Sequence, residues 1–205
     1  FDLPIFIGIL ANIGKVKKKD NLKNWIILGE ISLNGKIKAV RGVINATILA
    51  KEKDIKGVIV PVENYNEARL ISDIEIIPVK EINDVILFLN EKISGDELRT
   101  LSHTESSRKK NIKKIENIDF SDIKGQYLAK RALEIAAAGG HNIFLIGDPG
   151  SGKSMMAKRF NTILPEMAEE EIIETTKIYS ISGMLSEADP IITKRPFRAP
   201  HHTAT

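Results

Sequence analysis

Cysteine is absent from the sequence, which excludes disulfide bonds and thiolate metal sites. This absence fits a reducing compartment, and we expect a cytoplasmic protein. Long apolar runs are also missing. The longest one near the start, LPIFIGILA, is much shorter than a membrane span and has no basic segment before it. We therefore expect no membrane partner.

A large charge of one sign is the third absence. The net charge of +3 is too small, taken alone, to indicate nucleic-acid binding. The apolar share of 42% and the charged share of 28% are ordinary for a globular protein. With 205 residues, the chain has room for one or two domains, each with a real core.

The pattern of residues 1–93 predicts a compact α/β domain. Three strand-like runs, WIILGEISL, GVIVP and EIIPV, alternate with helical patterns in VINATILAKEK, NYNEARLI and INDVILFLNEK. Asn34-Gly35 follows the first run, and both residues tolerate the positive φ of a tight hairpin turn. A helix is expected over residues 3–13. Because the chain begins at Phe1, not Met, inside what looks like a structured element, we expect a fragment of a longer protein.

Residues 94–117 are polar and show no clear hydrophobic period. They include a basic cluster, formed by Arg108, Lys109, Lys110, Lys113 and Lys114. Such a segment is either a solvated linker between domains or a nucleic-acid contact, and the second interpretation needs a folded context. We take residues 94–117 as a linker.

A second α/β unit is predicted over residues 118–205. It begins with a helical pattern whose small and apolar residues share one face: Leu128, Ala132, Ile135, Ala136 and Gly139. The apolar run NIFLIG then predicts a strand of the parallel-sheet type. A glycine-rich loop follows, and the chain returns to a helix at Lys153 to Leu164.

This loop, GDPGSGKS, matches the phosphate-binding pattern G-x-x-x-x-G-K-[ST] in the strand–loop–helix context that the pattern requires. Glycines let backbone N–H groups turn toward a phosphate, and the start of the helix adds positive potential. The pattern gives Lys153 the catalytic role of bridging the β- and γ-phosphates of ATP, and Ser154 the role of a Mg²⁺ ligand. The alternative is a glycine-rich turn with a chance lysine. The predicted nucleotide-binding residues are Gly147, Asp148, Pro149, Gly150, Ser151, Gly152, Lys153 and Ser154.

Hydrolysis needs a further acidic residue at the end of a second apolar strand, the Walker B motif. After Ser154 the acidic residues Glu169, Glu170 and Glu171 occupy an expected helix start, where they favour the helix dipole. Asp189 follows a small polar turn. We therefore expect the chain to stop before Walker B and not to hydrolyse ATP by itself.

Two phrases, DIKGQYLAKRALEIAAAGGHNIFLIGDPGSGKS and ITKRPFRAPHHTAT, resemble the ComM/YifB family of magnesium-chelatase-like AAA+ ATPases. The resemblance implies that residues 118–205 are the first part of a P-loop AAA+ domain. It implies a complete protein that forms a ring and acts as a DNA helicase, promoting branch migration in recombination and natural transformation. By analogy, DIKGQ and His141 lie near the adenine. The alternatives are a magnesium chelatase motor subunit and a nucleotide-binding fragment without enzyme activity.

The first domain also resembles the proteolytic domain of Lon, whose catalysis uses a serine and a lysine. Ile5 stands at the position of the serine and Ile44 at that of the lysine. Neither side chain can act as a nucleophile or a base. Ser32 and Lys36 belong to the expected hairpin and do not inherit these roles. The resemblance therefore implies an inactive Lon-like domain.

The phrase RPFRAPHH contains the last candidate residues. Arg195 and Arg198 can contact the phosphate of a nucleotide or of DNA. His201-His202 is a weak metal motif, because adjacent residues of an extended chain point to opposite sides. A role between subunits or toward DNA, or a local structural role, fits the phrase better.

Overall fold

The computed structural model describes residues 2–106, 118–186 and 189–200. The chain divides into two compact units. Unit 1 consists of Phe1–Ile112 and Ile173–Ile191, and unit 2 consists of Lys113–Ile172 and Ile192–Thr205. Residues 173–191, which we expected in the second domain, therefore group with the first unit. The basic cluster of residues 108–114 and the pair His201-His202 lie outside the described residues.

Unit 1 is built on a parallel sheet, in agreement with the α/β class expected from the sequence. Its strands β1 (Trp25–Ile27), β4 (Gly57–Pro61) and β5 (Glu75–Val79) are ordered β1-β4-β5. All five residues of the central strand are buried, as expected for a continuous apolar run covered on both faces. A separate hairpin joins β2 (Glu30–Ile31) to β3 (Ile37–Lys38) around Gly35, whose φ is 80°.

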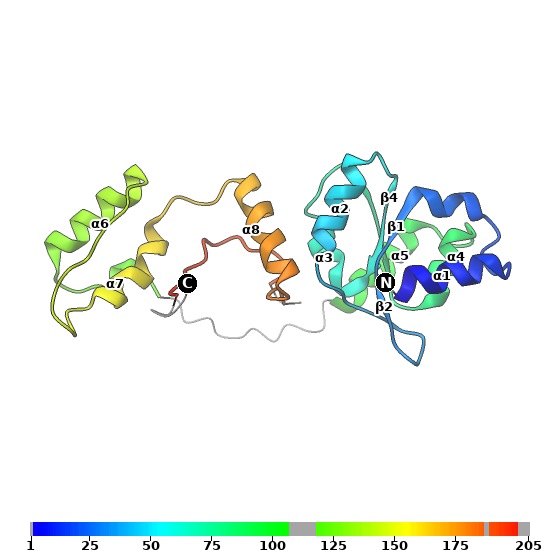
Figure 1. Ribbon diagram of the computed structural model, residues 1–205, viewed down its shortest axis with the longest axis horizontal. Helices are drawn as coiled ribbons and strands as arrows, with labels where there is room; N and C mark the ends of the chain where they lie inside the picture. The colour runs from blue at the N-terminus through cyan, green and yellow to red at the C-terminus, as the bar shows by residue number, and fades with distance from the viewer. Residues whose placement is uncertain (1, 107–117, 187–188, 201–205) are drawn as a thin grey trace. The chain divides into compact units, whose positions relative to one another are not determined.

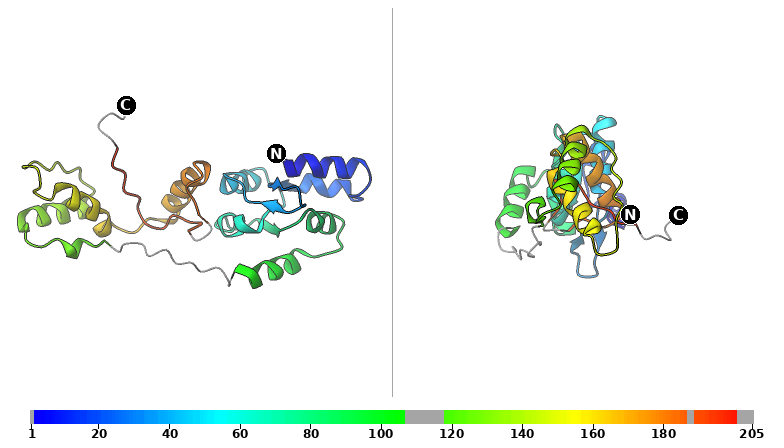
Figure 2. Two further views of the ribbon diagram at one scale, coloured as in Figure 1. Left: turned by 90° about the horizontal axis from the view of Figure 1, so that it is seen from below. Right: turned by 90° about the vertical axis from the view of Figure 1, so that its left-hand side faces the viewer.

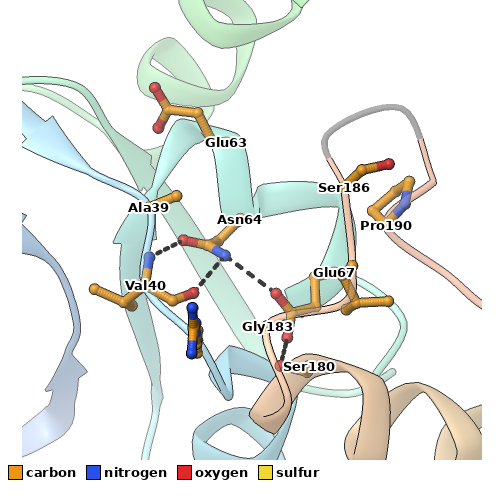
Figure 3. Close-up of a pocket in the computed structure, with 11 residues that line it drawn as sticks. Ala39, Val40, Glu63, Asn64, Glu67, Ser180, Gly183, Ser186 and Pro190 are labelled. Carbon is orange, nitrogen blue, oxygen red and sulfur yellow. Dashed lines mark hydrogen bonds between the residues drawn. The ribbon is translucent and has the colours of Figure 1, made fainter.

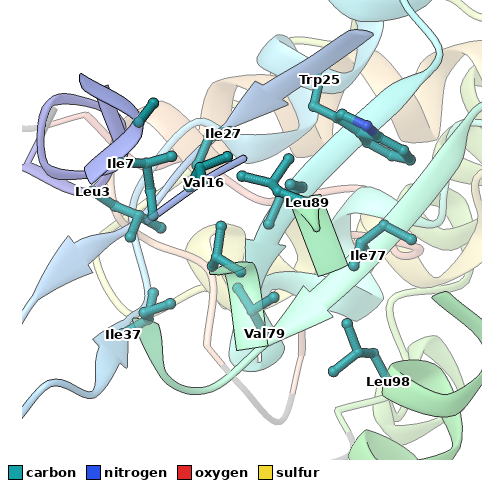
Figure 4. Packing of buried hydrophobic residues seen from close by; sticks show 13 residues of the cluster. Leu3, Ile7, Val16, Trp25, Ile27, Ile37, Ile77, Val79, Leu89 and Leu98 are labelled. Atoms are coloured by element: carbon teal, nitrogen blue, oxygen red, sulfur yellow. The ribbon is translucent and has the colours of Figure 1, made fainter. Parts of the chain in front are cut away.

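Alternate residues of β4 supply two different cores. Ile59 pairs with Ile27 and Ile77 across the sheet, and all three belong to one apolar cluster. Val58 and its neighbour Ile76 belong to the cluster on the other face. This alternation follows from the two-residue period of a strand. The first cluster is shown in Figure 4.

Helices cover both faces of this sheet (Figure 1). The first cluster packs beneath α1 (Asp2–Asn12), α4 (Ile82–Leu89) and α5 (Gly95–Ser106), through residues such as Leu3, Leu89 and Leu98. The second packs beneath α2 (Val43–Glu52) and α3 (Tyr65–Ala68). Unit 1 also contains two 3₁₀ turns, η1 (Lys19–Asn24) and η2 (Val62–Asn64).

The helix α5 differs from the expected linker. Leu98 is buried in the first core, and the Arg99 Nη1 donates to the Ile76 carbonyl at 3.0 Å. A capping box starts the helix: the Ser94 N–H donates to the Glu97 carboxylate at 2.7 Å, and the Glu97 N–H donates to the Ser94 hydroxyl at 3.2 Å. The sequence SGDE was the available signal, and the polar remainder of the segment obscured it.

Unit 2 contains the helices α6 (Tyr127–Gly139) and α7 (Lys153–Phe160), the 3₁₀ turns η3 (Phe120–Asp122) and η4 (Asn161–Ile163), and the start of α8 (Glu169–Ile181). The helices α6 and α7 lie side by side in Figure 1 and in Figure 2. Their small core consists of Phe120, Ile123, Leu133 and Met156. No described helix of the chain is both long enough and apolar enough to cross a membrane.

Two sequence expectations for unit 2 differ from the structure. In α6 the buried residues are Leu133, Ala136 and Ala137, whereas Leu128 is 90% exposed, so the predicted apolar face was wrong except at Ala136. The run NIFLIG is not a strand, and its Phe144 is 84% exposed. A strand needs a neighbour that pairs with its backbone, and none of the described residues of unit 2 pairs with this run.

Candidate nucleotide-binding loop

The loop between α6 and α7 holds all eight predicted nucleotide-binding residues in one contiguous stretch that ends in the first turn of α7. Gly150 and Gly152 have φ angles of 83° and 87°, in the left-handed region that favours glycine. Gly152 is the N-cap of α7, so the helix begins directly at Lys153. The first-turn N–H groups of this helix therefore lie at the end of the loop and lack acceptors within the helix.

The Lys153 ammonium lies within its own loop. Its Nζ donates to the Gly147 carbonyl and the Asp148 carbonyl, each at 2.7 Å, and to the Ser151 hydroxyl at 3.2 Å. These three acceptors match the three donors of a lysine ammonium. Ser154, by contrast, is exposed at the second position of α7. The loop thus brings a cation, a hydroxyl and a helix N-terminus together, which is the chemistry that a phosphate and its magnesium ion require.

The residues before α6 anchor the helix that follows the loop. Met156 of α7 is buried against Phe120 and Ile123. The Phe120 N–H donates to the Thr162 hydroxyl at 3.0 Å, and the Arg159 Nε lies 3.4 Å from the Asp122 carboxylate. The segment DIKGQ, which begins at Asp122, therefore starts against α7, whereas His141 is exposed after the end of α6.

Arg195 makes a second ordered cluster in unit 2. Its guanidinium donates to both oxygens of Glu171, at 3.0 and 2.7 Å, and its Nε donates to the Pro165 carbonyl at 2.8 Å. The Asn161 side-chain amide donates to the Arg195 carbonyl at 3.0 Å. We call these contacts the Arg195 clamp. They hold the start of the phrase RPFRAPHH against the connection between α7 and α8.

The carboxylate of Glu171 also accepts the Ala168 N–H at 2.9 Å at the start of α8. The Arg195 guanidinium is the main reason that the pKa of Glu171 lies below its ordinary value of 4.5, and the Ala168 N–H contributes as well. Sequence reasoning assigned Glu171 only to the helix dipole and missed its ion pair. Arg198, the other arginine of the phrase, is exposed.

The two isoleucines that the sequence analysis placed at the positions of the Lon catalytic residues lie in different environments. Ile5 is exposed on α1, and Ile44 is fully buried in α2. The Ser32 hydroxyl donates to the Lys36 carbonyl at 2.7 Å within the hairpin turn, as expected for a turn residue. Among the described residues, no group of three histidine, aspartate or glutamate side chains is arranged to hold a metal ion.

Comparisons with known proteins define the class first. Residues 119–205 match the family model described as "Magnesium chelatase, subunit ChlI", and residues 1–64 match the one described as "Subunit ChlI of Mg-chelatase". The chain is therefore part of a magnesium-chelatase-like family of AAA+ ATPases.

Individual relatives define the family more narrowly. The chain is 41% identical over 206 residues to the competence protein ComM of Haemophilus influenzae, and 35% identical over 205 residues to YifB of Escherichia coli. It belongs to the ComM/YifB family. Both alignments cover 100% of this chain but only 39% and 38% of the relatives, so the chain spans about two fifths of their length. Lon protease 2 of Bacillus subtilis is 39% identical over 82 residues, which cover 39% of this chain and 15% of that protein.

Proposed function

We propose that residues 118–205 bind ATP·Mg²⁺ as part of a ring-forming AAA+ ATPase. The observation that carries this proposal is the geometry of Lys153, whose ammonium lies at the start of α7 within a loop of left-handed glycines. A lysine on the surface can be solvated by water and does not need such contacts. The contacts of Lys153 support the proposal, because they hold a cation within the loop that would receive the phosphates.

When ATP·Mg²⁺ is bound, it supplies the phosphoanhydride bond whose cleavage drives such motors. The chain's own residues bind and orient it. Lys153 would exchange its contacts with the loop carbonyls for the phosphates, and the N–H groups of the loop and of the first turn of α7 would donate to the phosphates. The hydroxyl of Ser154, at the second position of the helix, would ligate the magnesium ion.

For the complete protein we propose a DNA helicase that promotes branch migration in recombination and natural transformation. The support is the alignment of the whole chain with a protein named for competence, together with the similarity of 82 of its residues to a Lon protease. The alternative is a magnesium chelatase motor subunit, to which the names of both family models point. A nucleotide-binding fragment without enzyme activity is the third possibility.

The deciding experiment measures ATP hydrolysis by the complete protein in the presence of branched DNA, and separately with a porphyrin-bound chelatase partner. Stimulation by DNA that weakens steeply with salt is expected, because phosphate contacts release counterions. The Lys153→Ala variant should lose the stimulated rate. Stimulation by the chelatase partner alone would favour the alternative, and hydrolysis that neither additive changes would refute both motors.

A further inference from the structure

The N-terminus of α2 lacks a cap from its own sequence. Its N-cap residue is Gly42, which has no side chain to accept the N–H groups of the first turn. Two distant residues, Glu67 and Ser180, accept them instead, and Figure 3 shows the side chains of both together with Asn64. The Ile44 N–H donates to the Glu67 carboxylate at 3.0 Å, and the Gly42 N–H donates to the Ser180 hydroxyl at 2.8 Å. Ser180 is in α8, 138 positions after Gly42.

Glu67 is 4% exposed and forms the centre of this arrangement. Besides the Ile44 N–H, its carboxylate accepts the Asn64 side-chain amide at 3.1 Å and the Ser180 hydroxyl. Asn64 is itself fixed by two hydrogen bonds of 2.9 Å to the backbone of Val40. We call Gly42, Ile44, Asn64 and Glu67 the Glu67 socket. It is held in place by contacts that do not involve α8.

Ser180, the residue that contacts the socket, lies in the last turn of α8, and this helix has a well-defined end. Beyond Ser180, the Met184 N–H donates to the Tyr179 carbonyl at 2.9 Å and the Gly183 N–H donates to the Ser180 carbonyl at 3.0 Å, which is a Schellman motif. Gly183 has the left-handed φ of 66° that this motif requires. A Cβ there would clash with the Arg41 Nε, so the Arg41 side chain passes close to this turn.

The contact between α8 and the rest of unit 1 contains little apolar area. The buried side chains of α8 are Thr176 and Ser180, which carry hydroxyl groups. Ile178 and Ile181 are 58% and 62% exposed. Because burial of apolar surface is the main force that holds packed elements together, this contact depends on hydrogen bonds that water can replace.

The contact also leaves a buried donor unsatisfied. Among the described residues, the Nδ2 of Asn45 is buried without a hydrogen-bond acceptor. It lies beside the junction, since a Cβ built on Gly42 would be 4.0 Å from this nitrogen and 3.9 Å from the Ile181 side chain. A buried donor without a partner disfavours the conformation that buries it.

We propose that Ser180 is a releasable latch, and that the last turn of α8 docks on the Glu67 socket and leaves it without unfolding the core of unit 1. In the released state Glu67 still accepts the Ile44 N–H, while water reaches Gly42 and Asn45. A cavity of about 210 Å³ already adjoins Asn64, Glu67 and Ser180, which gives water a route to the latch. The latch is thus a conformational device within unit 1.

Hydrogen exchange, followed residue by residue in the whole chain, tests the latch. In Ser180→Ala, the Gly42 amide should exchange roughly fivefold to tenfold faster, because it loses one hydrogen bond. The Ile44 amide should keep its rate, because its acceptor is Glu67. The matched control is Ser182→Ala, since the Ser182 hydroxyl donates only to the Ile178 carbonyl on the exposed side of the same helix end. This control should leave Gly42 unchanged.

Asn45→Ala should have the opposite effect. It removes the unsatisfied donor from the docked state, so the Gly42 amide should exchange about threefold more slowly relative to the Ile44 amide. The ratio of the two amides separates docking from a general stabilisation of α2. The proposal is refuted if Ser180→Ala leaves Gly42 unchanged, or if it accelerates the amides of β4 equally, because Ser180 would then belong to the folding core. Unchanged exchange in Asn45→Ala would also contradict it.

Discussion

Replacement of Lys153 by alanine tests the nucleotide-binding loop most directly. In the structure the ammonium makes two hydrogen bonds of 2.7 Å to carbonyl oxygens and one of 3.2 Å to the Ser151 hydroxyl. On binding ATP it would exchange these contacts for phosphate oxygens, which carry a negative charge that the carbonyl oxygens lack. Hydrogen bonds to charged groups contribute about 1.5–3 kcal/mol net.

This net contribution of a charged hydrogen bond predicts that Lys153→Ala weakens ATP binding by roughly 10- to 150-fold. Isothermal titration of the chain with ATP and Mg²⁺ measures the change. Lys158→Ala is the matched control, because Lys158 is an exposed lysine in the last turn of the same helix. Its affinity should stay within about twofold of the unmodified chain, since surface charges outside a site contribute little. Equal affinity for ATP in Lys153→Ala would refute the role assigned to this residue.

Three further predictions concern the rest of the chain. Leu89→Ala, at a fully buried core position, should lower the free energy of unfolding by about 2–5 kcal/mol. Leu49→Ala, at a position 46% exposed, should change it by less than about 0.5 kcal/mol. Chemical denaturation measures both variants, and equal effects would contradict the assigned core. Because the pKa of Glu171 is lowered in the folded chain, its contact with Arg195 stabilises the clamp above pH 4.5 and is lost as the pH falls through the lowered value. An NMR titration should find this pKa returning toward 4.5 in Arg195→Ala but not in Lys194→Ala, and an unchanged pKa in both would exclude the ion pair. The chain should not cleave unfolded protein substrates, because Ile5 and Ile44 occupy the positions of the Lon catalytic residues; cleavage that a serine-directed reagent abolishes would overturn this prediction.

The sheet of unit 1 was predictable because its signals are local. The runs GVIVP and EIIPV are continuous and apolar, and strands buried on both faces have this composition. The hairpin followed from Asn34-Gly35, and Gly35 has the expected positive φ. The phosphate-binding pattern is contiguous as well. Its residues are neighbours in the sequence, so they lie together even though the run before the loop does not form a strand in the structure.

The helix α5 shows where local signals were too weak. Among the described side chains of this helix, Leu98 is the deeply buried apolar one, whereas Leu101 is exposed and the sequence is otherwise mostly polar. Hydrophobic periodicity therefore could not detect it, although the capping box of Ser94 and Glu97 marks its start. Tertiary contacts with β5 stabilise a helix that composition alone did not indicate.

The Arg195 clamp and the Ser180 latch had no local signal at all, because their partners lie far apart in the sequence. Arg195 reaches Glu171 across 24 positions, and Ser180 reaches Glu67 across 113. In both cases a distant contact gives the side chain a role that the neighbouring sequence did not indicate. An arginine of a candidate DNA-contacting phrase is engaged with a carboxylate, and a helix-end serine accepts the N–H of another helix.

If Arg195 contacts DNA in the complete protein, it must first leave a bidentate carboxylate partner, so its contribution to DNA affinity is reduced by the contacts given up. Lys194, which is exposed beside it, carries no such cost in the structure.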